Sequence, residues 1–201
     1  LLNRASSQLS TEIENANWEF YGRTLTGAVS QRPRDERALQ TINGAVGEAL
    51  GKLYVEKKFP AEAKAKAEKM IKNIFSAFEN RINNLSWMSA ETKVSALAKL
   101  HKSRIKIGYP DKWKDYSALT IKSPEEGGTY FENAKSMAQW RFNENIAELN
   151  KPVDKDRWGM SPQTVNAYYN PSNNEIVFPA AILQPPFYNY QADEAVNYGG
   201  I

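Results

Sequence analysis

Cysteine is absent from the 201-residue sequence, and histidine occurs only once, at His101. A catalytic zinc ion needs three protein ligands, usually drawn from His, Cys and carboxylates, so this chain cannot supply a His-rich zinc site. The absence of cysteine excludes a thiol nucleophile, and a Ser-His-Asp triad would have to use His101 as its base. His101 ends a predicted helix, where a partly positive ring suits the helix dipole, and no Gly-flanked serine turn lies nearby. We therefore interpret it as a structural residue.

Long apolar runs and an excess of one charge are also missing. No stretch of about 18 apolar residues is present, and the first residues, LLNR, lack the basic start and apolar core of a secretion signal. The 26 Lys and Arg residues are scattered among 23 Asp and Glu residues, which leaves a net charge of +3. We therefore expect no membrane segment in this chain and no nucleic-acid partner.

The first two-thirds of the sequence has the apolar spacing of helices, with an apolar residue at every third or fourth position. Ser89 is in the position of a helix N-cap, and Gly22 is the predicted end of the first helix. Helices are predicted over residues 2–20, 35–57, 61–85, 89–102 and 130–149. The third helix places Phe78 among its core residues, and its Lys-rich opposite face, interleaved with Glu, is interpreted as a solvated surface.

Three glycines share one face of the predicted helix over residues 35–57. Gly44, Gly47 and Gly51 are spaced by three and four residues, and each costs about 1 kcal/mol relative to alanine in a helix. We expect the close approach of another helix to compensate for this cost. A flexible hinge is the alternative.

Short strands are predicted where apolar and polar residues alternate. Residues 104–110 form one such segment, followed by a predicted loop over 111–128. After Pro152 the composition changes to one rich in Pro, Tyr and Asn, so we place a domain boundary near residue 160. Beyond it, a hairpin is predicted from two strands, residues 165–169 and 175–178, joined by a turn.

Pro179 follows the second predicted strand and blocks further pairing there, so one edge of the hairpin is expected to remain open. An open edge presents unpaired backbone groups that can take up an extended peptide as an added strand. An Asn side chain can both donate and accept hydrogen bonds in that role. Peptide binding is therefore one interpretation, and plain structure is the other.

Several ordered segments of the sequence resemble neprilysin-like zinc metalloendopeptidases, in particular a bacterial member of the oligoendopeptidase O type. The most specific matches are residues 165–169 (VNAYY), 174–187 (NEIVFPAAILQPPF) and 197–201 (NYGGI). Upstream matches in the same order are residues 51–55 (GKLYV), 87–93 (WMSAETK), 107–111 (IGYPD) and 153–158 (VDKDRW). The resemblance covers nearly the whole chain.

The resemblance implies roles for four residues. Asn166 and Ala167 would hold the substrate backbone along an edge strand, whereas Ile182 and Phe187 would help to line the apolar pocket for the substrate residue after the cut bond. In relatives, the Gly-Gly-Ile element is followed by a helix bearing HExxH, whose two histidines bind zinc and whose glutamate is the general base. The sequence ends at Ile201 without these groups, so we expect no catalytic residue, no bound metal and no activity in this chain alone.

The resemblance also implies a fold that is mainly α with a small β part. Residues 1–160 would be a non-catalytic helical region enclosing the peptidase chamber, and residues 161–201 the opening β-hairpin of a thermolysin-like catalytic domain. The parent would be a zinc endopeptidase acting on small peptides, with the C-terminal remainder of the catalytic domain as the partner of this chain. Relatives are often exported or membrane-anchored. A non-catalytic peptide-binding module and a purely structural helical domain are the alternative interpretations.

Overall fold

The computed structural model describes residues 2–201, which pack as two units that each combine two separate stretches of the sequence. Unit 1 contains the residues up to Val46 together with Asp115–Val153, and unit 2 contains Gly47–Lys114 and Asp154–Ile201. Helix α3 (Arg34–Lys58) passes from one unit to the other, and Val46 leaves the helical conformation there, with φ −131° and ψ 39°. The predicted catalytic-domain boundary near residue 160 lies inside unit 2 and remains a prediction.

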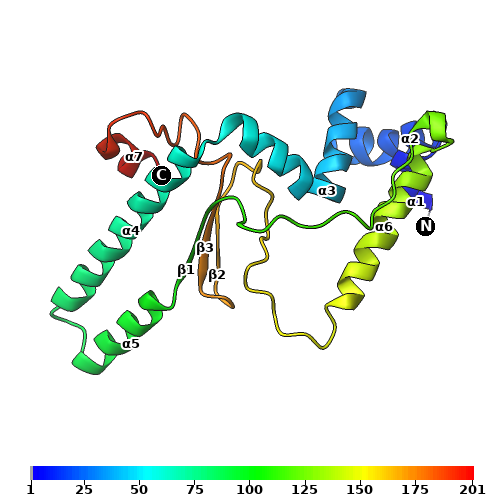
Figure 1. The fold of residues 1–201 in the computed structure, drawn as a ribbon. Helices are drawn as coiled ribbons and strands as arrows, with labels where there is room; N and C mark the ends of the chain where they lie inside the picture. The colour runs from blue at the N-terminus through cyan, green and yellow to red at the C-terminus, as the bar shows by residue number, and fades with distance from the viewer. Residues whose placement is uncertain (1) are drawn as a thin grey trace. The chain divides into compact units, whose positions relative to one another are not determined.

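Unit 1 is helical (Figure 1). Polar contacts join its helices: Glu14 pairs with Arg37, and the hydroxyls of Thr41 and Tyr130 lie 2.7 Å apart. Buried Trp140 packs against Tyr116, with ring centroids 5.0 Å apart. Its elements are α1 (Leu2–Ala5), a 3-10 turn (Ser6–Gln8), α2 (Thr11–Trp18), a π-helix (Glu19–Thr24), the first part of α3, a 3-10 turn (Pro124–Glu126) and α6 (Tyr130–Ala147).

The single helix predicted over residues 2–20 is wrong in one respect, because the chain is interrupted before α2. Leu9 and Ser10 adopt extended conformations, and α2 starts at the next residue. Gly22 does not end the helix either, since it lies within the π-helix. A Cβ atom at Gly22 would lie 2.6 Å from Nε1 of Trp18, so the glycine makes room for that indole ring.

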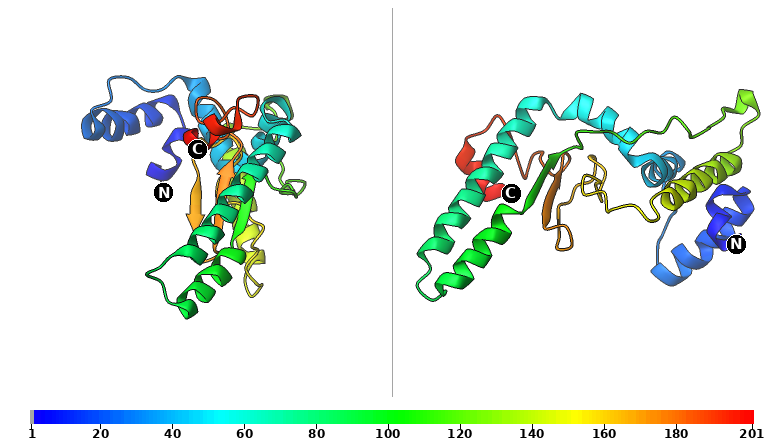
Figure 2. Two further views of the ribbon diagram at one scale, coloured as in Figure 1. Left: turned by 90° about the vertical axis from the view of Figure 1, so that its left-hand side faces the viewer. Right: turned by 60° about the horizontal axis from the view of Figure 1, so that its bottom comes forward.

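Unit 2 contains a three-stranded sheet and a helical hairpin, α4 (Ala61–Asn84) and α5 (Ala90–His101), which run antiparallel (Figure 2). The strands are β1 (Arg104–Gly108), β2 (Tyr168–Asn170) and β3 (Glu175–Pro179), in the order β1-β3-β2. Strand β1 is parallel to β3, and β2 is antiparallel to it. A short helix, α7 (Glu194–Gly200), completes the unit.

The core of unit 2 lies between α4 and one face of the sheet. Ile105 and Ile107 alternate with polar residues along β1 and pack on this core together with Phe178 of β3. The buried side of α4 begins with two alanines, Ala63 and Ala67, whose small side chains allow the sheet to approach closely. Burial of each large apolar side chain contributes about 1.5–3 kcal/mol. The other buried core residues are Val55, Phe59, Met70, Ile71, Ala180, Leu183 and Tyr188.

Most predicted elements of unit 2 are confirmed, and the fold is mainly α with a small β part. Ser89 caps α5 as predicted, because its side chain accepts a hydrogen bond from the Thr92 amide at 3.2 Å. Phe78 is not a core residue, since 57% of it is exposed. It lies one turn beyond Ile74 and Phe75, which still pack against the core cluster.

The glycine face of α3 is a site of close approach at two of its three positions. A Cβ atom at Gly47 would lie 2.5 Å from Oγ of Ser161, and one at Gly51 would lie 2.5 Å from Cδ of Pro162. Nothing lies within 4 Å of such an atom at Gly44. The predicted close approach is therefore correct, but an irregular segment, residues 161–163, approaches α3 where a helix was expected.

Candidate functional site

The predicted hairpin is present, but its first strand is shorter than predicted and starts three residues later, at Tyr168, whereas its second strand extends one residue further, to Pro179. Tyr168 pairs with Val177, and Asn170 pairs with Glu175. The turn ends at Asn174, whose φ of 48° is in the left-handed region that Asn tolerates better than most residues. The side chain of Asn174 donates to the Lys99 carbonyl at 2.9 Å, which anchors the turn to the end of α5.

The open edge of the hairpin lies on β2, not on β3. Strand β3 is central: its second edge pairs with β1 through Pro179, which stands opposite Gly108. The expectation that Pro179 blocks further pairing on the second strand is therefore wrong, whereas one edge of the hairpin does stay open, on β2. Among residues 2–201, no strand pairs with the outer edge of β2. Such an edge can accept an extended chain through main-chain hydrogen bonds.

Asn166 and Ala167 lie immediately before β2, at the start of this edge. Asn166 is exposed, and its side-chain oxygen accepts a hydrogen bond from the Ala167 amide at 2.8 Å. The backbone N–H of Asn166 donates to the Thr164 carbonyl at 3.0 Å. These local bonds hold the carboxamide beside the backbone, and its NH₂ group still has donors to offer to a ligand.

Ile182 and Phe187 follow β3. Ile182 is partly buried and packs against the core cluster, whereas Phe187 is 43% exposed. Because β2 and β3 are antiparallel, the start of β2 and the end of β3 lie at the same end of the hairpin. The structure therefore places Asn166 and Ala167 at the same end of the hairpin as the last residue of β3, and Ile182 and Phe187 follow that residue by three and eight positions.

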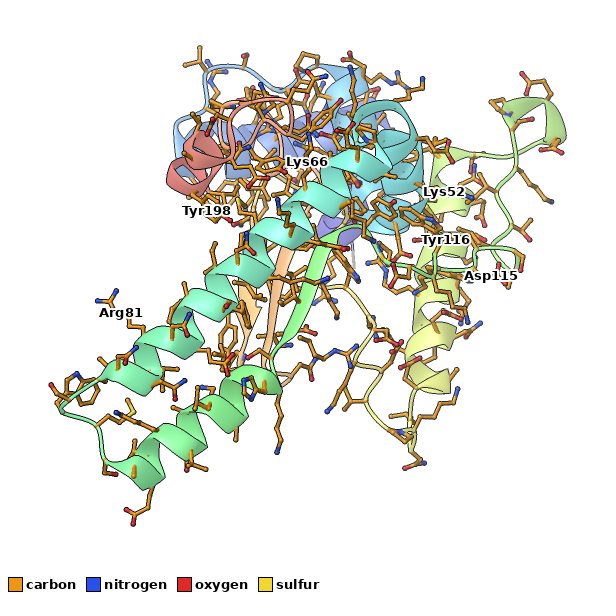
Figure 3. The ribbon with its side chains drawn as sticks, turned by 60° about the vertical axis from the view of Figure 1, so that its left-hand side comes forward. Lys52, Lys66, Arg81, Asp115, Tyr116 and Tyr198 are labelled. Carbon is orange, nitrogen blue, oxygen red and sulfur yellow. The ribbon has the colours of Figure 1, made fainter. Side chains whose placement is uncertain are left out.

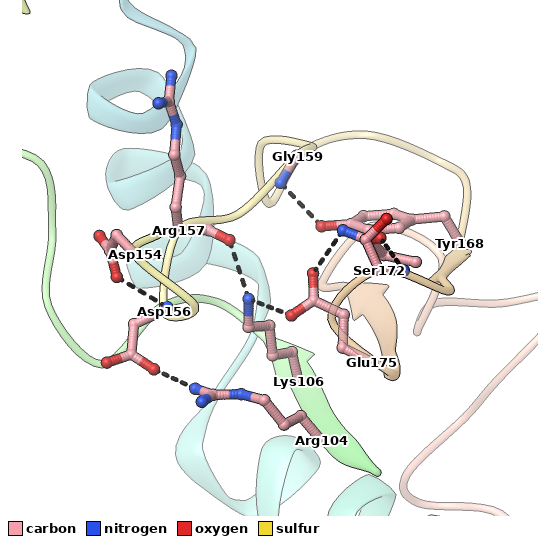
Figure 4. Close-up of polar contacts among 10 residues, drawn as sticks. Arg104, Lys106, Asp154, Asp156, Arg157, Gly159, Tyr168, Ser172 and Glu175 are labelled. Atoms are coloured by element: carbon pink, nitrogen blue, oxygen red, sulfur yellow. Dashed lines mark hydrogen bonds and ion pairs between the residues drawn. The ribbon is translucent and has the colours of Figure 1, made fainter. Parts of the chain in front are cut away.

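Sequence reasoning missed a buried ion pair on the sheet face opposite the core (Figure 4). Nζ of Lys106 in β1 lies 2.8 Å from Oε2 of Glu175 in β3. Only 8% of Lys106 and 1% of Glu175 are exposed. One signal was available: Lys106 interrupts an apolar strand between two isoleucines. Its partner could not be found without knowing that β1 pairs with β3.

Helix α7 was not predicted, although Asp193 offers the signal of an N-cap. Its side chain accepts a hydrogen bond from the Ala195 amide at 2.8 Å. Contacts from α4 hold α7: Lys69 lies 2.9 Å from Glu194, and Asn73 donates to the Tyr198 hydroxyl at 2.8 Å. Figure 3 shows α7, with Tyr198 labelled, beside α4. A pocket of about 70 Å³ lies here, which is too small for a peptide because ligand pockets usually measure about 300–1,000 Å³.

The described residues do not fit a metal ion. Within residues 2–201, no group of three or more His, Cys, Asp or Glu side chains could hold one. The His101 side chain is 57% exposed at the end of α5, with Nε2 3.2 Å from Oε1 of Glu79. In the same part of the chain, no helix combines the length and apolarity that a membrane span requires.

Comparisons with known proteins agree with this architecture. Two models of peptidase family M13 match the chain, one over residues 1–110 and the other over residues 166–201. An endothelin-converting enzyme homolog of Locusta migratoria is 42% identical over 98% of this chain and 27% of its own length. A neutral endopeptidase of Lactobacillus helveticus is 38% identical over 100% of this chain and 30% of its own length.

A solved structure of the zinc metalloprotease Zmp1 of Mycobacterium tuberculosis, in an open state, is also similar. It matches with a TM-score of 0.89 and 46% identity, over 99% of this chain and 30% of that protein. The chain therefore spans less than a third of the length of these relatives. The family models and the relatives cover the helices of both units as well as the hairpin, and they agree with one another: the chain belongs to peptidase family M13.

Proposed function

We propose that the full-length protein is a zinc-dependent endopeptidase that hydrolyses small peptides, and that this chain binds the substrate backbone along the open edge of β2. The unpaired edge itself carries the proposal, because it begins beside exposed Asn166 and half-buried Ala167. Family membership and the printed names of the relatives support the reaction class. The zinc ion would be held by other parts of the full-length protein, since the described residues of this chain do not fit it.

In this proposal Asn166 and Ala167 align the peptide. An extended chain that lies beside β2 exchanges main-chain hydrogen bonds with it, and the carboxamide of Asn166 supplies further donors. Because these contacts address the backbone, they are independent of the substrate sequence. Their task is to hold the peptide in the site, and they contribute alike to the binding of substrate and transition state.

Ile182 and Phe187 are proposed to contribute to the specificity pocket. Phe187 is 43% exposed, so its ring is available to an apolar substrate side chain. Ile182 packs against the core with its partly buried side chain and would form the base of the pocket. Both residues follow β3 in the chain, and the end of β3 lies beside the start of β2, which supports a shared site with Asn166.

The test uses the zinc-loaded full-length protein with the substitution Asn166→Ala. Loss of one or two neutral hydrogen bonds, each contributing about 0.5–1.5 kcal/mol, predicts a KM increase of about tenfold for a fluorescence-quenched pentapeptide. The value of kcat should change little, because backbone binding acts on the ground state and the transition state alike. Asn173→Ala, the same change in the hairpin turn, should leave both constants unchanged.

Two outcomes would contradict the proposal. Wild-type KM in Asn166→Ala would exclude the edge as the binding site. Binding of the pentapeptide without cleavage by the zinc-loaded protein would exclude the peptidase and favour a non-catalytic peptide-binding module that uses the same strand.

A further inference from the structure

The buried ion pair between Lys106 and Glu175 connects all three strands of the sheet. Glu175 begins the central strand, and its register partners are Arg104 in β1 and Asn170 in β2. Its Oε2 lies 2.8 Å from Nζ of Lys106, and Nδ2 of Asn170 lies 3.5 Å from its Oε1. One carboxylate therefore links the parallel partner strand to the strand with the open edge.

A loop covers this pair and is tied to the outer strands (Figure 4). Nζ of Lys106 donates to the Arg157 carbonyl at 2.9 Å, and Arg104 pairs with Asp156. The amide of Gly159 donates to the hydroxyl of Tyr168 at 2.8 Å. The loop thus holds β1 through two contacts and β2 through one.

The contact with Tyr168 matters for the site because Tyr168 directly follows Ala167. Residues 166 and 167 precede the paired part of β2, so no ladder hydrogen bond fixes them from outside. Their position depends on the anchoring of the strand that follows, through the Tyr168 hydroxyl and through Asn170 beside Glu175. Displacement of Glu175 or of the loop would therefore move the binding edge.

A purely stabilising role explains this pair poorly. Taking two ions out of water is costly, and replacing a buried pair with apolar side chains of similar volume is often neutral or stabilising. The contact is chiefly Coulombic, since Oε2 of Glu175 has no hydrogen bond of good geometry among the described residues. A buried pair that does not maximise stability is consistent with a role in fixing one arrangement of the strands.

We propose that Lys106 and Glu175 are positioning residues for the substrate-binding edge: their ion pair fixes β2 and the loop over residues 154–159 so that Asn166 and Ala167 meet the peptide backbone. This inference rests on the proposed function of that edge. It assigns to the pair a role in peptide affinity that acts through β2, without contact between either charge and the substrate.

The experiment uses the full-length zinc-loaded protein and the same pentapeptide. Glu175→Gln removes the charge at nearly constant volume, and Lys106→Met with Glu175→Leu replaces the pair with apolar side chains. Both variants are expected to raise KM about tenfold while kcat stays within about twofold. The double variant keeps the sheet free of an unpaired charge, so it measures positioning even if Glu175→Gln folds poorly. Lys69→Met with Glu194→Leu removes an exposed pair of the same unit, 2.9 Å apart, and should leave KM unchanged.

A double-mutant cycle with Asn166→Ala separates positioning from general destabilisation. If the pair acts through the edge, its loss adds little to KM once Asn166 has been removed, so the two effects are not additive. Additive effects, or wild-type KM in the folded double variant, would overturn the inference. If Asn166→Ala itself has no effect on KM, the proposed function fails first. If Asn166→Ala weakens binding and the pair variants do not, only the positioning role fails.

Discussion

Gly51 offers a direct test of the packing between α3 and residues 161–163. A Cβ atom at this position would lie 2.5 Å from Cδ of Pro162 and 2.7 Å from Oε1 of Gln163, whereas relaxed contacts between carbon atoms need about 3.5–4.0 Å. Neither neighbour moves away easily. The carbonyl of buried Pro162 accepts a hydrogen bond from Ala181 at 2.9 Å, and Nε2 of Gln163 donates to the Gly47 carbonyl at 2.9 Å.

The expected effect of Gly51→Ala is the difference between two terms. Alanine gains about 1 kcal/mol of helix propensity over glycine. Overpacking of a closed contact costs about 1–3 kcal/mol, and an overlap of about 1 Å with tethered atoms belongs at the upper end of that range. The net effect is a loss of about 2 kcal/mol in the free energy of local opening, or roughly thirtyfold in the opening equilibrium.

Hydrogen exchange of the full-length protein, followed by mass spectrometry on peptides from α3, measures this opening directly. Exchange in residues 47–58 should accelerate in Gly51→Ala. Gly44→Ala is the matched control, because nothing lies within 4 Å of its added Cβ, and it should slow exchange in residues 34–45 by up to about fivefold. If Gly51→Ala protects α3 as Gly44→Ala does, the close approach of residues 161–163 is absent and the packing argument is wrong.

Two further predictions concern the segment that leads into α7. Asn197 is 6% exposed, and its side chain accepts from the Asn189 amide at 2.8 Å and donates to the Asn189 carbonyl at 2.9 Å. Asn197→Ala should therefore cost about 1–3 kcal/mol and expose residues 189–200 to limited proteolysis; an unchanged cleavage rate there would contradict it. Burial, and then the charge of Glu194, raise the pKa of Tyr188 above its usual 10.0. Because the fold favours the protonated phenol of Tyr188, this residue contributes to folding stability below pH 10, and the contribution is lost as the pH rises through the folded-state pKa. The tyrosinate absorbance of Tyr188, measured as the signal that Tyr188→Phe removes, should therefore appear above pH 10. Titration at or below pH 10 would show that Tyr188 is solvated.

Local patterns predicted the helices of unit 2 well, because each depends on residues close together in the sequence. The apolar period of α4 and the N-cap at Ser89 needed no tertiary information. Exposed Phe78 shows the limit of predicting burial from apolar spacing. The spacing identifies the apolar face of the helix, whereas tertiary packing decides how much of the length of that face is buried.

The site was predictable in part, for a different reason. Asn166 was assigned from the hairpin pattern and the resemblance, and Phe187 from the resemblance alone; their roles remain predictions, whereas the hairpin itself is a local structure and is present. The parallel pairing of β1 with β3 places Arg104 opposite Glu175, although the two residues are far apart in the sequence. Local sequence patterns therefore could not show which edge of the hairpin stays open, or that Lys106 pairs with Glu175. Pro179 was misinterpreted because its ladder partner, Gly108, is equally distant in the sequence.

The same parallel pairing has a consequence for synthesis on the ribosome. Ser103, just before β1, and Asn174, just before β3, are bonded across 71 positions of sequence. At about 5–20 residues per second, β1 emerges several seconds before β3 exists to cover it. During that interval the strand RIKIG presents two isoleucines and two unpaired edges, and a charge within such a strand opposes its pairing with other chains. We therefore expect Lys106 to oppose aggregation of the nascent chain before it pairs with Glu175 in the folded protein.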